Sequence, residues 1–309
     1  MSVDTNPPAS GVRVPWHEVH PQVRAAVEEF LGGRVAEAVT QPGGFSPAAA
    51  VRLRTENGRR AFVKAVGPEP NPDSVRLYRS ELRIAAALPE SVPAPRLLTG
   101  FELEGWVALV FEDVEGEHPE MPWRRDQLDL VLHAVERMSA ALTPSPIELP
   151  PIGETLGASF RGWRNLLEGG ADGLDPWAAC HLEELAELES GWTAAAAGDT
   201  LVHGDLRADN ILFAGDHVYV VDWPWACVGA PWVDLVCMLP SIGMQGGPMP
   251  HELFTDPDPA VTAMVAALTG YFVEHGRLPD PPGLPTVRAF QRAQGVVALD
   301  WLKHRTGWA

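Results

Sequence analysis

A short polar loop in the second half of the chain contains the residues best suited to chemistry. Residues 203–210 read HGDLRADN and are flanked on both sides by short apolar runs. A turn at residues 215–216 then leads into a strand-like segment that ends at Asp222. Asp205, Asn210 and Asp222 would therefore converge at one end of a hairpin-like unit. Carboxylate and amide oxygens suit Mg²⁺, which usually binds one or two carboxylates together with phosphate oxygens.

The spacing of these residues resembles that of a known family of kinases. HGDLRADN followed by VVDW is similar to the catalytic loop and metal-binding motif of the aminoglycoside phosphotransferase family, which in turn resembles the HRDxxxxN and DFG motifs of protein kinases. The resemblance implies that Asp205 is the catalytic base or orients the acceptor hydroxyl. It implies that Asn210 and Asp222 hold Mg²⁺ that bridges the phosphates of ATP or GTP. His203 would support the loop, and Arg207 is expected to contact the transferred phosphate.

A lysine and a glutamate upstream extend this resemblance. Lys64 and Lys303 are the only lysines among 23 basic residues, and Lys64 ends the strand-like sequence Ala-Phe-Val-Lys. Glu81 follows 17 residues later in a predicted helix. The resemblance implies that Lys64 contacts the α- and β-phosphates and that Glu81 is its ion-pair partner. Without the downstream loop, two charges at this separation would indicate nothing, because most such side chains are solvated.

Two further segments resemble nucleotide-binding parts of the family. Gly43, Gly44 and Ser46 lie where the nucleotide-positioning loop falls, although the sequence is not GxGxxG and an ordinary hairpin remains an alternative. A linker that contains Glu112 and Val114 resembles the hinge that offers backbone groups to the adenine. Its side chains do not distinguish ATP from GTP.

The elements that must position these residues change in kind near residue 115. Apolar periodicity and turn residues predict helices at 20–31 and 74–88, a strand, glycine turn and strand over 41–55, and strands at 59–66, 96–102 and 106–111. Later helices are predicted at 126–142, 176–190, 258–275 and over much of 284–304. The predicted fold is therefore α+β, with a small antiparallel β-rich N-terminal nucleotide-binding lobe (1–115) and a mainly helical C-terminal catalytic and acceptor-binding lobe (116–309). The resemblance implies that this is the two-lobed protein-kinase-like fold.

Composition excludes several other classes of protein. The net charge of −18 disfavours a nucleic-acid partner, which needs a basic face. The first twenty residues do not show the basic start and apolar run of a secretory signal, and no stretch reaches the ~18 apolar residues of a membrane helix. The three cysteines form no close pair, which argues against a disulfide framework or a zinc site. We therefore expect a cytoplasmic protein without a membrane partner.

The acceptor is less well defined by the sequence. Residues 116–309 carry 11 basic and 26 acidic side chains, which would suit an aminoglycoside or amino sugar, and hence antibiotic resistance, but would equally serve solubility. The end of the chain, residues 303–309, is locally basic, which argues against such a substrate. Only a short segment separates Asp222 from Asp234, which we expect to be structural. This leaves little room for a protein-kinase activation loop and favours a small-molecule acceptor.

Two other readings of the motif stay open. A nucleotide-binding pseudo-kinase that recognises a partner is possible in principle, although the intact set of Lys64, Asp205, Asn210 and Asp222 argues against it. A metal phosphoesterase would also use His, Asp and Asn ligands, but the nearby histidines are too few for one. The sequence alone therefore favours a small-molecule kinase.

Overall fold

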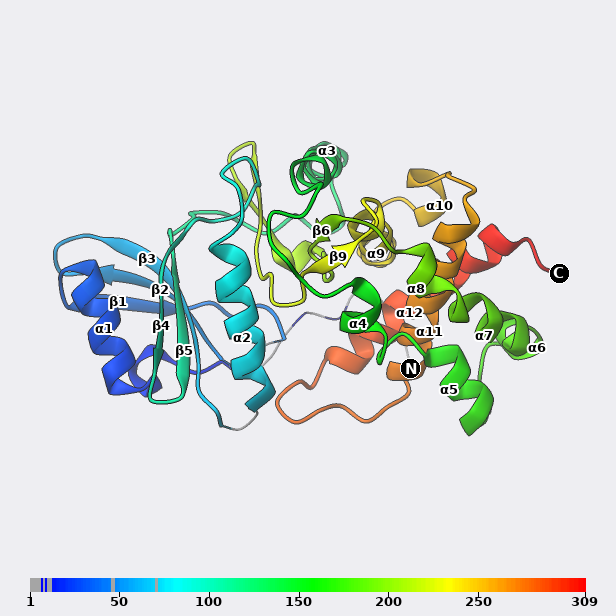
Figure 1. The fold of residues 1–309 in the computed structure, drawn as a ribbon, viewed down its shortest axis with the longest axis horizontal. Helices are drawn as coiled ribbons and strands as arrows, with labels where there is room; N and C mark the ends of the chain where they lie inside the picture. The colour runs from blue at the N-terminus through cyan, green and yellow to red at the C-terminus, as the bar shows by residue number, and fades with distance from the viewer. Residues whose placement is uncertain (1–6, 8, 10–12, 46–47, 70–71) are drawn as a thin grey trace.

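The computed structural model describes residues 7, 9, 13–45, 48–69 and 72–309. The chain forms an elongated molecule in which a β-sheet with its helices lies at one end and a group of helices at the other (Figure 1). The elements of the first part are η1 (Trp16–Glu18), α1 (Pro21–Leu31), β1 (Val35–Thr40), β2 (Ala49–Thr55), β3 (Arg60–Val66), α2 (Pro72–Ala85), β4 (Leu97–Leu103) and β5 (Trp106–Phe111). Its strands form one antiparallel sheet in the order β1-β2-β3-β5-β4.

The two faces of this sheet have different partners because side chains alternate along each strand. On one face, residues such as Val51, Val63 and Val110 pack against the apolar side of α1. On the other face, Leu109 packs with Tyr78 of α2. Lys64 of β3 is paired in register with Leu109 of β5 and so lies on the α2 side. The sheet register thus directs the lysine toward the rest of the molecule.

The sequence located most of these elements but misplaced the first strand. It predicted a strand at the start of residues 41–55, whereas β1 is Val35–Thr40. This edge strand is exposed along most of its length, so its sequence has no buried alternation that would indicate it. The turn between β2 and β3 was predicted correctly, and Gly58 there has a φ of 83°.

The second part is mainly helical. Its elements are α3 (Arg125–Ala141), α4 (Ile152–Leu156), α5 (Gly162–Gly169), α6 (Pro176–Cys180), α7 (Leu182–Ser190), α8 (Trp192–Ala195), β6 (Thr200–Val202), η2 (Ala208–Asn210), β7 (Ile211–Ala214), β8 (His217–Val220), β9 (Cys227–Gly229), α9 (Val233–Met244), α10 (Pro250–Leu253), α11 (Pro259–His275) and α12 (Val287–Thr306). The helix predicted over 176–190 is two helices, because the chain breaks at His181. Helix α9 was not predicted, since it is buried along most of its length and carries little amphipathic pattern.

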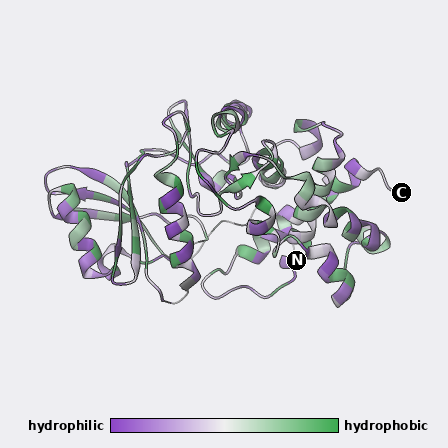
Figure 2. Ribbon diagram, viewed as in Figure 1, coloured by the Kyte–Doolittle hydropathy of each residue, from purple (hydrophilic) through white to green (hydrophobic). Residues whose placement is uncertain are grey.

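Helix α11 is the centre of this helical part. It packs against α5, α7, α8 and α12, and most of its residues are buried. Its contact with α5 is so close that a Cβ on Gly162 would lie 1.9 Å from the carbonyl oxygen of Gly270. Most of the helices around α11 carry both hydrophilic and hydrophobic residues (Figure 2). Within the described residues, no helix has the length and apolar character needed to cross a membrane.

Candidate active site

The polar loop and Asp222 are brought together by the β7–β8 hairpin. The loop follows β6, and Asn210 is the last residue before β7. Strand β8 returns antiparallel to β7, with Val220 paired to Ile211. The backbone N–H of Val221 then donates to the carbonyl oxygen of Asn210 at 2.9 Å. Asn210 and Asp222, which are twelve residues apart in sequence, therefore lie beside one another at the start of the hairpin.

A buried aspartate holds the loop in place. Asp234 accepts hydrogen bonds from the backbone N–H groups of His203 (2.8 Å) and Gly204 (3.0 Å), and burial raises the pKa of its carboxyl group. The Nε2 of His203 donates to the carbonyl oxygen of Val221 at 3.0 Å, while its Nδ1 accepts from the N–H of Asp205 at 3.2 Å. These bonds need the neutral imidazole with its proton on Nε2. The supporting roles expected of His203 and Asp234 agree with this arrangement.

Asp205 is held by a guanidinium within the same loop. Arg207 donates to the carboxylate of Asp205 and makes two parallel bonds of 3.0 Å to the carboxylate of Asp209. Burial raises the pKa of Asp205 to about 6, and the charge of Arg207 opposes this rise. The carboxylate is therefore mostly ionised at pH 7 yet more basic than an ordinary aspartate, which suits a general base. Arg207 lies next to Asp205, but here its donors are bonded to carboxylates.

The predicted lysine–glutamate pair forms, and it reaches Asp222 as well. The Nζ of Lys64 lies 2.5 Å from an oxygen of Glu81 and 2.5 Å from Oδ1 of Asp222. Burial disfavours the charged ammonium, but the two carboxylates outweigh it and raise the pKa of Lys64. Burial also opposes ionisation of Asp222, and Lys64 outweighs it and lowers the pKa of that carboxyl group. This ion-pair set joins the N-terminal sheet, helix α2 and the segment after β8.

The side chains of Asn210 and Asp222 fit a hard cation. Asn210 donates its Nδ2 to the carbonyl oxygen of Asp205 at 2.7 Å, which leaves its Oδ1 for a ligand. Asp222 uses Oδ1 for Lys64 and leaves Oδ2. Its φ of 71° is unusual for a residue other than glycine, and such backbone strain is often found at functional sites. In the described part of the chain, no group of three or more His, Cys, Asp or Glu side chains could hold a metal ion.

The glycine loop lies over the catalytic loop. The carbonyl oxygen of Gly43 accepts a hydrogen bond from Arg13, and Gly44 has a φ of 81° that favours glycine. The next residue, Phe45, places its ring 5.6 Å from the guanidinium carbon of Arg207. The structure therefore brings this loop close to Asp205, as the resemblance implies. Ser46, which was predicted to bind the nucleotide, lies outside the described residues.

The predicted hinge lines a pocket between the two parts of the molecule. The pocket has a volume of about 390 Å³ and is lined by Arg60, Glu112, Asp113, Val114, Glu115, Ala214 and Tyr219. The N–H of Glu112 donates to the carbonyl oxygen of Arg96, and its carboxylate accepts from the N–H of Arg96, both at 3.0 Å. Neither the carbonyl of Glu112 nor the N–H of Val114 has a hydrogen-bond partner among the described residues, so both remain available to a ligand.

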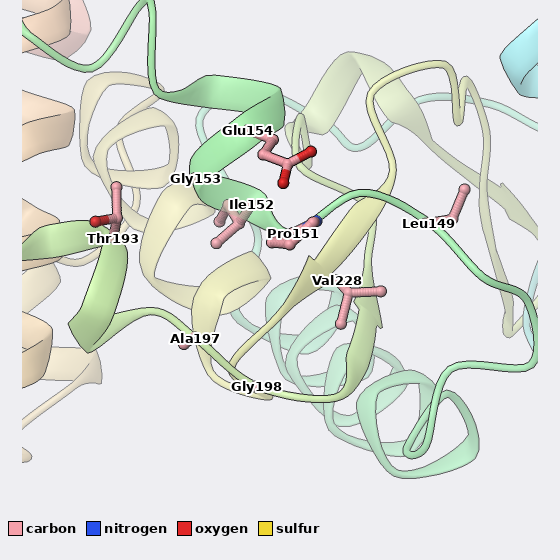
Figure 3. Close-up of a pocket in the computed structure, with 9 residues that line it drawn as sticks. All are labelled: Leu149, Pro151, Ile152, Gly153, Glu154, Thr193, Ala197, Gly198 and Val228. Carbon is pink, nitrogen blue, oxygen red and sulfur yellow. The ribbon is translucent and has the colours of Figure 1, made fainter.

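A larger pocket lies elsewhere. Figure 3 shows this pocket of about 490 Å³ between α4, α8 and β9. Most of its lining is apolar or glycine, with Glu154 and Thr193 as its polar side chains. None of the predicted site residues lines it. The chemistry therefore points to the loop and the hinge rather than to the larger pocket.

The structure also places residues near Asp205 that the sequence did not single out. The ring of Phe290, from α12, lies 5.4 Å from that of Phe45 and 5.6 Å from the guanidinium carbon of Arg207. Tyr271, from α11, is close enough that burial and then the charge of Asp205 raise the pKa of its hydroxyl. These side chains come from helices far along the chain and belong to no motif, so no signal in the sequence could have identified them.

Comparison with known proteins agrees with this geometry. The model of the phosphotransferase enzyme family, APH, matches residues 38–262, which is most of the chain and includes every residue of the ion-pair set. The chain belongs to this family. It is thus a phosphotransferase that acts on a hydroxyl group of a small molecule, and the resemblance to aminoglycoside phosphotransferases is confirmed. No curated protein sequence matches the chain.

Solved structures confirm the α+β, protein-kinase-like fold of this phosphotransferase. A thermostable mutant of aminoglycoside phosphotransferase APH(4)-Ia, in complex with ADP and hygromycin B, superposes with a TM-score of 0.61 at 14% identity, covering 93% of this chain and 100% of that one. A putative fructosamine-3-kinase from Haemophilus somnus gives 0.55 at 13% identity, covering 92% and 96%. The choline kinase LicA from Streptococcus pneumoniae gives 0.55 at 14% identity, covering 90% and 98%.

Proposed function

We propose that this phosphotransferase moves the γ-phosphoryl group of ATP or GTP to a small molecule, with Asp205 as the base at the acceptor hydroxyl. The observation that carries the proposal is the contact of Lys64 with both Glu81 and Asp222, beside the loop that holds Asp205. Such a set provides a cation for phosphate, candidate metal ligands and a base, which are the parts that phosphoryl transfer needs. The ADP complex named above and an amicoumacin kinase in complex with AMP-PNP and Ca²⁺, with a TM-score of 0.52, support a nucleotide donor.

The residues have distinct roles in this mechanism. Asp205 accepts the proton of the acceptor hydroxyl as its oxygen attacks the γ-phosphorus and the bond to the leaving nucleoside diphosphate breaks. Lys64 binds the phosphates of the donor, and Glu81 fixes the position of its ammonium group. Asn210 and Asp222 would hold Mg²⁺, which neutralises phosphate charge when bound. Arg207 balances the negative charge of Asp205 and lies near enough to reach the transferred phosphate.

We assign nucleotide binding to residues 1–115 and catalysis and acceptor binding to residues 116–309. The glycines of the 43–44 loop would cover the phosphates, and the backbone of Glu112 and Val114 would bind the base. Aminoglycosides and amino sugars are the acceptors suggested by the overall acidity of the second part. The side chains around Asp205 favour a different class of acceptor, which is argued in the next subsection.

Substitution of Asp205 tests the proposal directly. We expect Asp205→Asn to lower kcat by about 10²–10⁴-fold, because a positioned base contributes that much, while the affinity for ATP-Mg²⁺ stays within about twofold. Asp216→Asn is the matched control, since Asp216 is exposed in the turn between β7 and β8. The measurement is nucleotide consumption against a panel of hydroxylated metabolites and antibiotics, with nucleotide binding followed by calorimetry. Full transfer by Asp205→Asn would contradict the assigned role.

A further inference from the structure

A line of hydrogen-bonded polar side chains runs between α12 and α11 on the side of Asp205. The guanidinium of Arg288 donates to the amide oxygen of Gln291 at 2.8 Å. The amide nitrogen of Gln291 donates to the hydroxyl of Tyr271 at 2.8 Å. Gln291 is 6% exposed, so its orientation is fixed by these two bonds. Arg288 and Tyr271 are thereby held in one arrangement.

This set lies close to the proposed centre. Phe290, which adjoins Gln291 on α12, lies 5.6 Å from the guanidinium carbon of Arg207, and Arg207 donates to the carboxylate of Asp205. The charges of Asp205, Arg207 and Arg288 all act on the Tyr271 hydroxyl, although burial has the largest effect on its pKa. Tyr271 is therefore placed between the catalytic loop and Arg288.

Arg288 is a half-buried cation without an acidic partner. Its side chain donates to the carbonyl oxygen of Pro279 at 3.2 Å and to the amide oxygen of Gln291, both of which are neutral. Asp280 accepts from the backbone N–H of Arg288 at 3.3 Å, not from the guanidinium. Within the described chain, no carboxylate lies within 4.0 Å of that guanidinium, whereas Arg207 contacts two. A guanidinium binds carboxylate or phosphate oxygens with its strongest hydrogen bonds.

Tyr271 offers a second donor beside this cation. Its hydroxyl oxygen accepts from Gln291, and its own hydrogen has no acceptor among the residues that the structure describes. The ring is fixed by Phe160, at 5.4 Å between centroids, and by His275, at 4.3 Å. The nearest acid on α11, Glu274, accepts from Asn165 at 2.8 Å. Tyr271 and Arg288 thus present donors that a ligand with acceptor oxygens would satisfy.

We propose that Arg288 and Tyr271 bind an anionic oxygen group of the acceptor, so that the acceptor is a hydroxylated carboxylate or phosphate and not a polycation. The inference rests on the proposed function, because it assumes that the acceptor hydroxyl meets Asp205. It replaces the expectation from overall charge with one from local charge. The acidic side chains of residues 116–309 are spread over exposed helices such as α7, whereas the groups bounding the acceptor side of Asp205 include Arg207 and Arg288.

Matched pairs of probes that differ only in charge test this inference. Binding of D-glucuronate and D-glucuronamide, and of ribose 5-phosphate and ribose, is measured by calorimetry on the full chain saturated with AMP-PNP and Mg²⁺, with kanamycin as the polycation. We expect the wild type to bind at least one charged member about tenfold or more tightly than its neutral partner, as one charge-assisted bond allows. The two pairs distinguish a carboxylate from a phosphate.

Variants then assign the preference to these residues. Arg288→Gln should abolish the preference, Tyr271→Phe should reduce it a few fold, and neither should change AMP-PNP affinity. Arg277→Gln is the matched control, since Arg277 is exposed and likewise donates to backbone carbonyls, and it should keep the preference. The proposal is overturned if the wild type shows no charge preference, if kanamycin binds most tightly, or if Arg288→Gln retains the preference. Because AMP-PNP binding is measured separately, loss of nucleotide binding would instead count against the proposed function.

Discussion

The raised pKa of Asp205 makes a specific prediction about the pH dependence of the reaction. A free carboxylate with the ordinary pKa of 3.8 would be almost fully ionised at pH 5, whereas burial raises the pKa of Asp205 to about 6. If Asp205 must be ionised to accept the hydroxyl proton, kcat/KM should fall about tenfold between pH 7 and pH 5. The loss should follow the acidic side of the profile, because protonation removes the base.

Arg207 supplies the control that isolates this group. Its guanidinium favours the charged form of Asp205 and so opposes the rise in pKa. Replacing Arg207 by Gln should therefore move the pKa of Asp205 upward, by about 1–3 units, which is the usual effect of losing an opposite charge at this range. The acid limb of kcat/KM should move to higher pH by the same amount. Titration of the nucleotide phosphates is common to both proteins, so the difference between the profiles reports Asp205.

The assay is the steady-state rate of nucleoside diphosphate release at pH 5 to 9, with saturating Mg²⁺ and the best acceptor found. An acid limb near pH 4 in the wild type would refute the reasoning, since Asp205 would then behave as an exposed carboxylate. A shift to lower pH in Arg207→Gln would refute it as well, because the sign of the electrostatic effect would be wrong. Nuclear magnetic resonance of labelled aspartate would show which group titrates.

Two further predictions concern the ion-pair set and the helical core. Lys64→Met should raise the KM for the nucleotide about tenfold or more in steady-state kinetics, because the phosphates lose a charge-assisted donor worth about 1.5–3 kcal/mol; an unchanged KM would show that Lys64 does not bind the donor. Gly162→Ala should lower the free energy of unfolding by about 1–3 kcal/mol in chemical denaturation, because its Cβ would overlap the carbonyl oxygen of Gly270. Gly169→Ala on the same helix, with no atom within 4 Å of its Cβ, should be nearly neutral.

The sequence was sufficient to identify the chemistry because phosphoryl transfer uses residues in short segments. The loop with Asp205 and Asn210, the strand that ends at Asp222 and the turn between them are all local, so their spacing could be read directly. The same holds for most helices and strands, whose periodicity reflects one buried face. The exposed edge strand β1 and the buried helix α9 were missed because neither has such a face.

Only the tertiary structure decided which distant side chains meet. The contact of Lys64 with Asp222 spans 158 positions and depends on how the N-terminal sheet faces the β7–β8 hairpin. The clamp by Asp234, the approach of Phe45 to Phe290 and the set of Arg288, Gln291 and Tyr271 likewise join separate elements. Charge counted along the chain suggested a cationic acceptor, but electrostatic interactions weaken with distance and solvent screening. The character of the acceptor site is therefore set by the few groups that the fold brings beside Asp205.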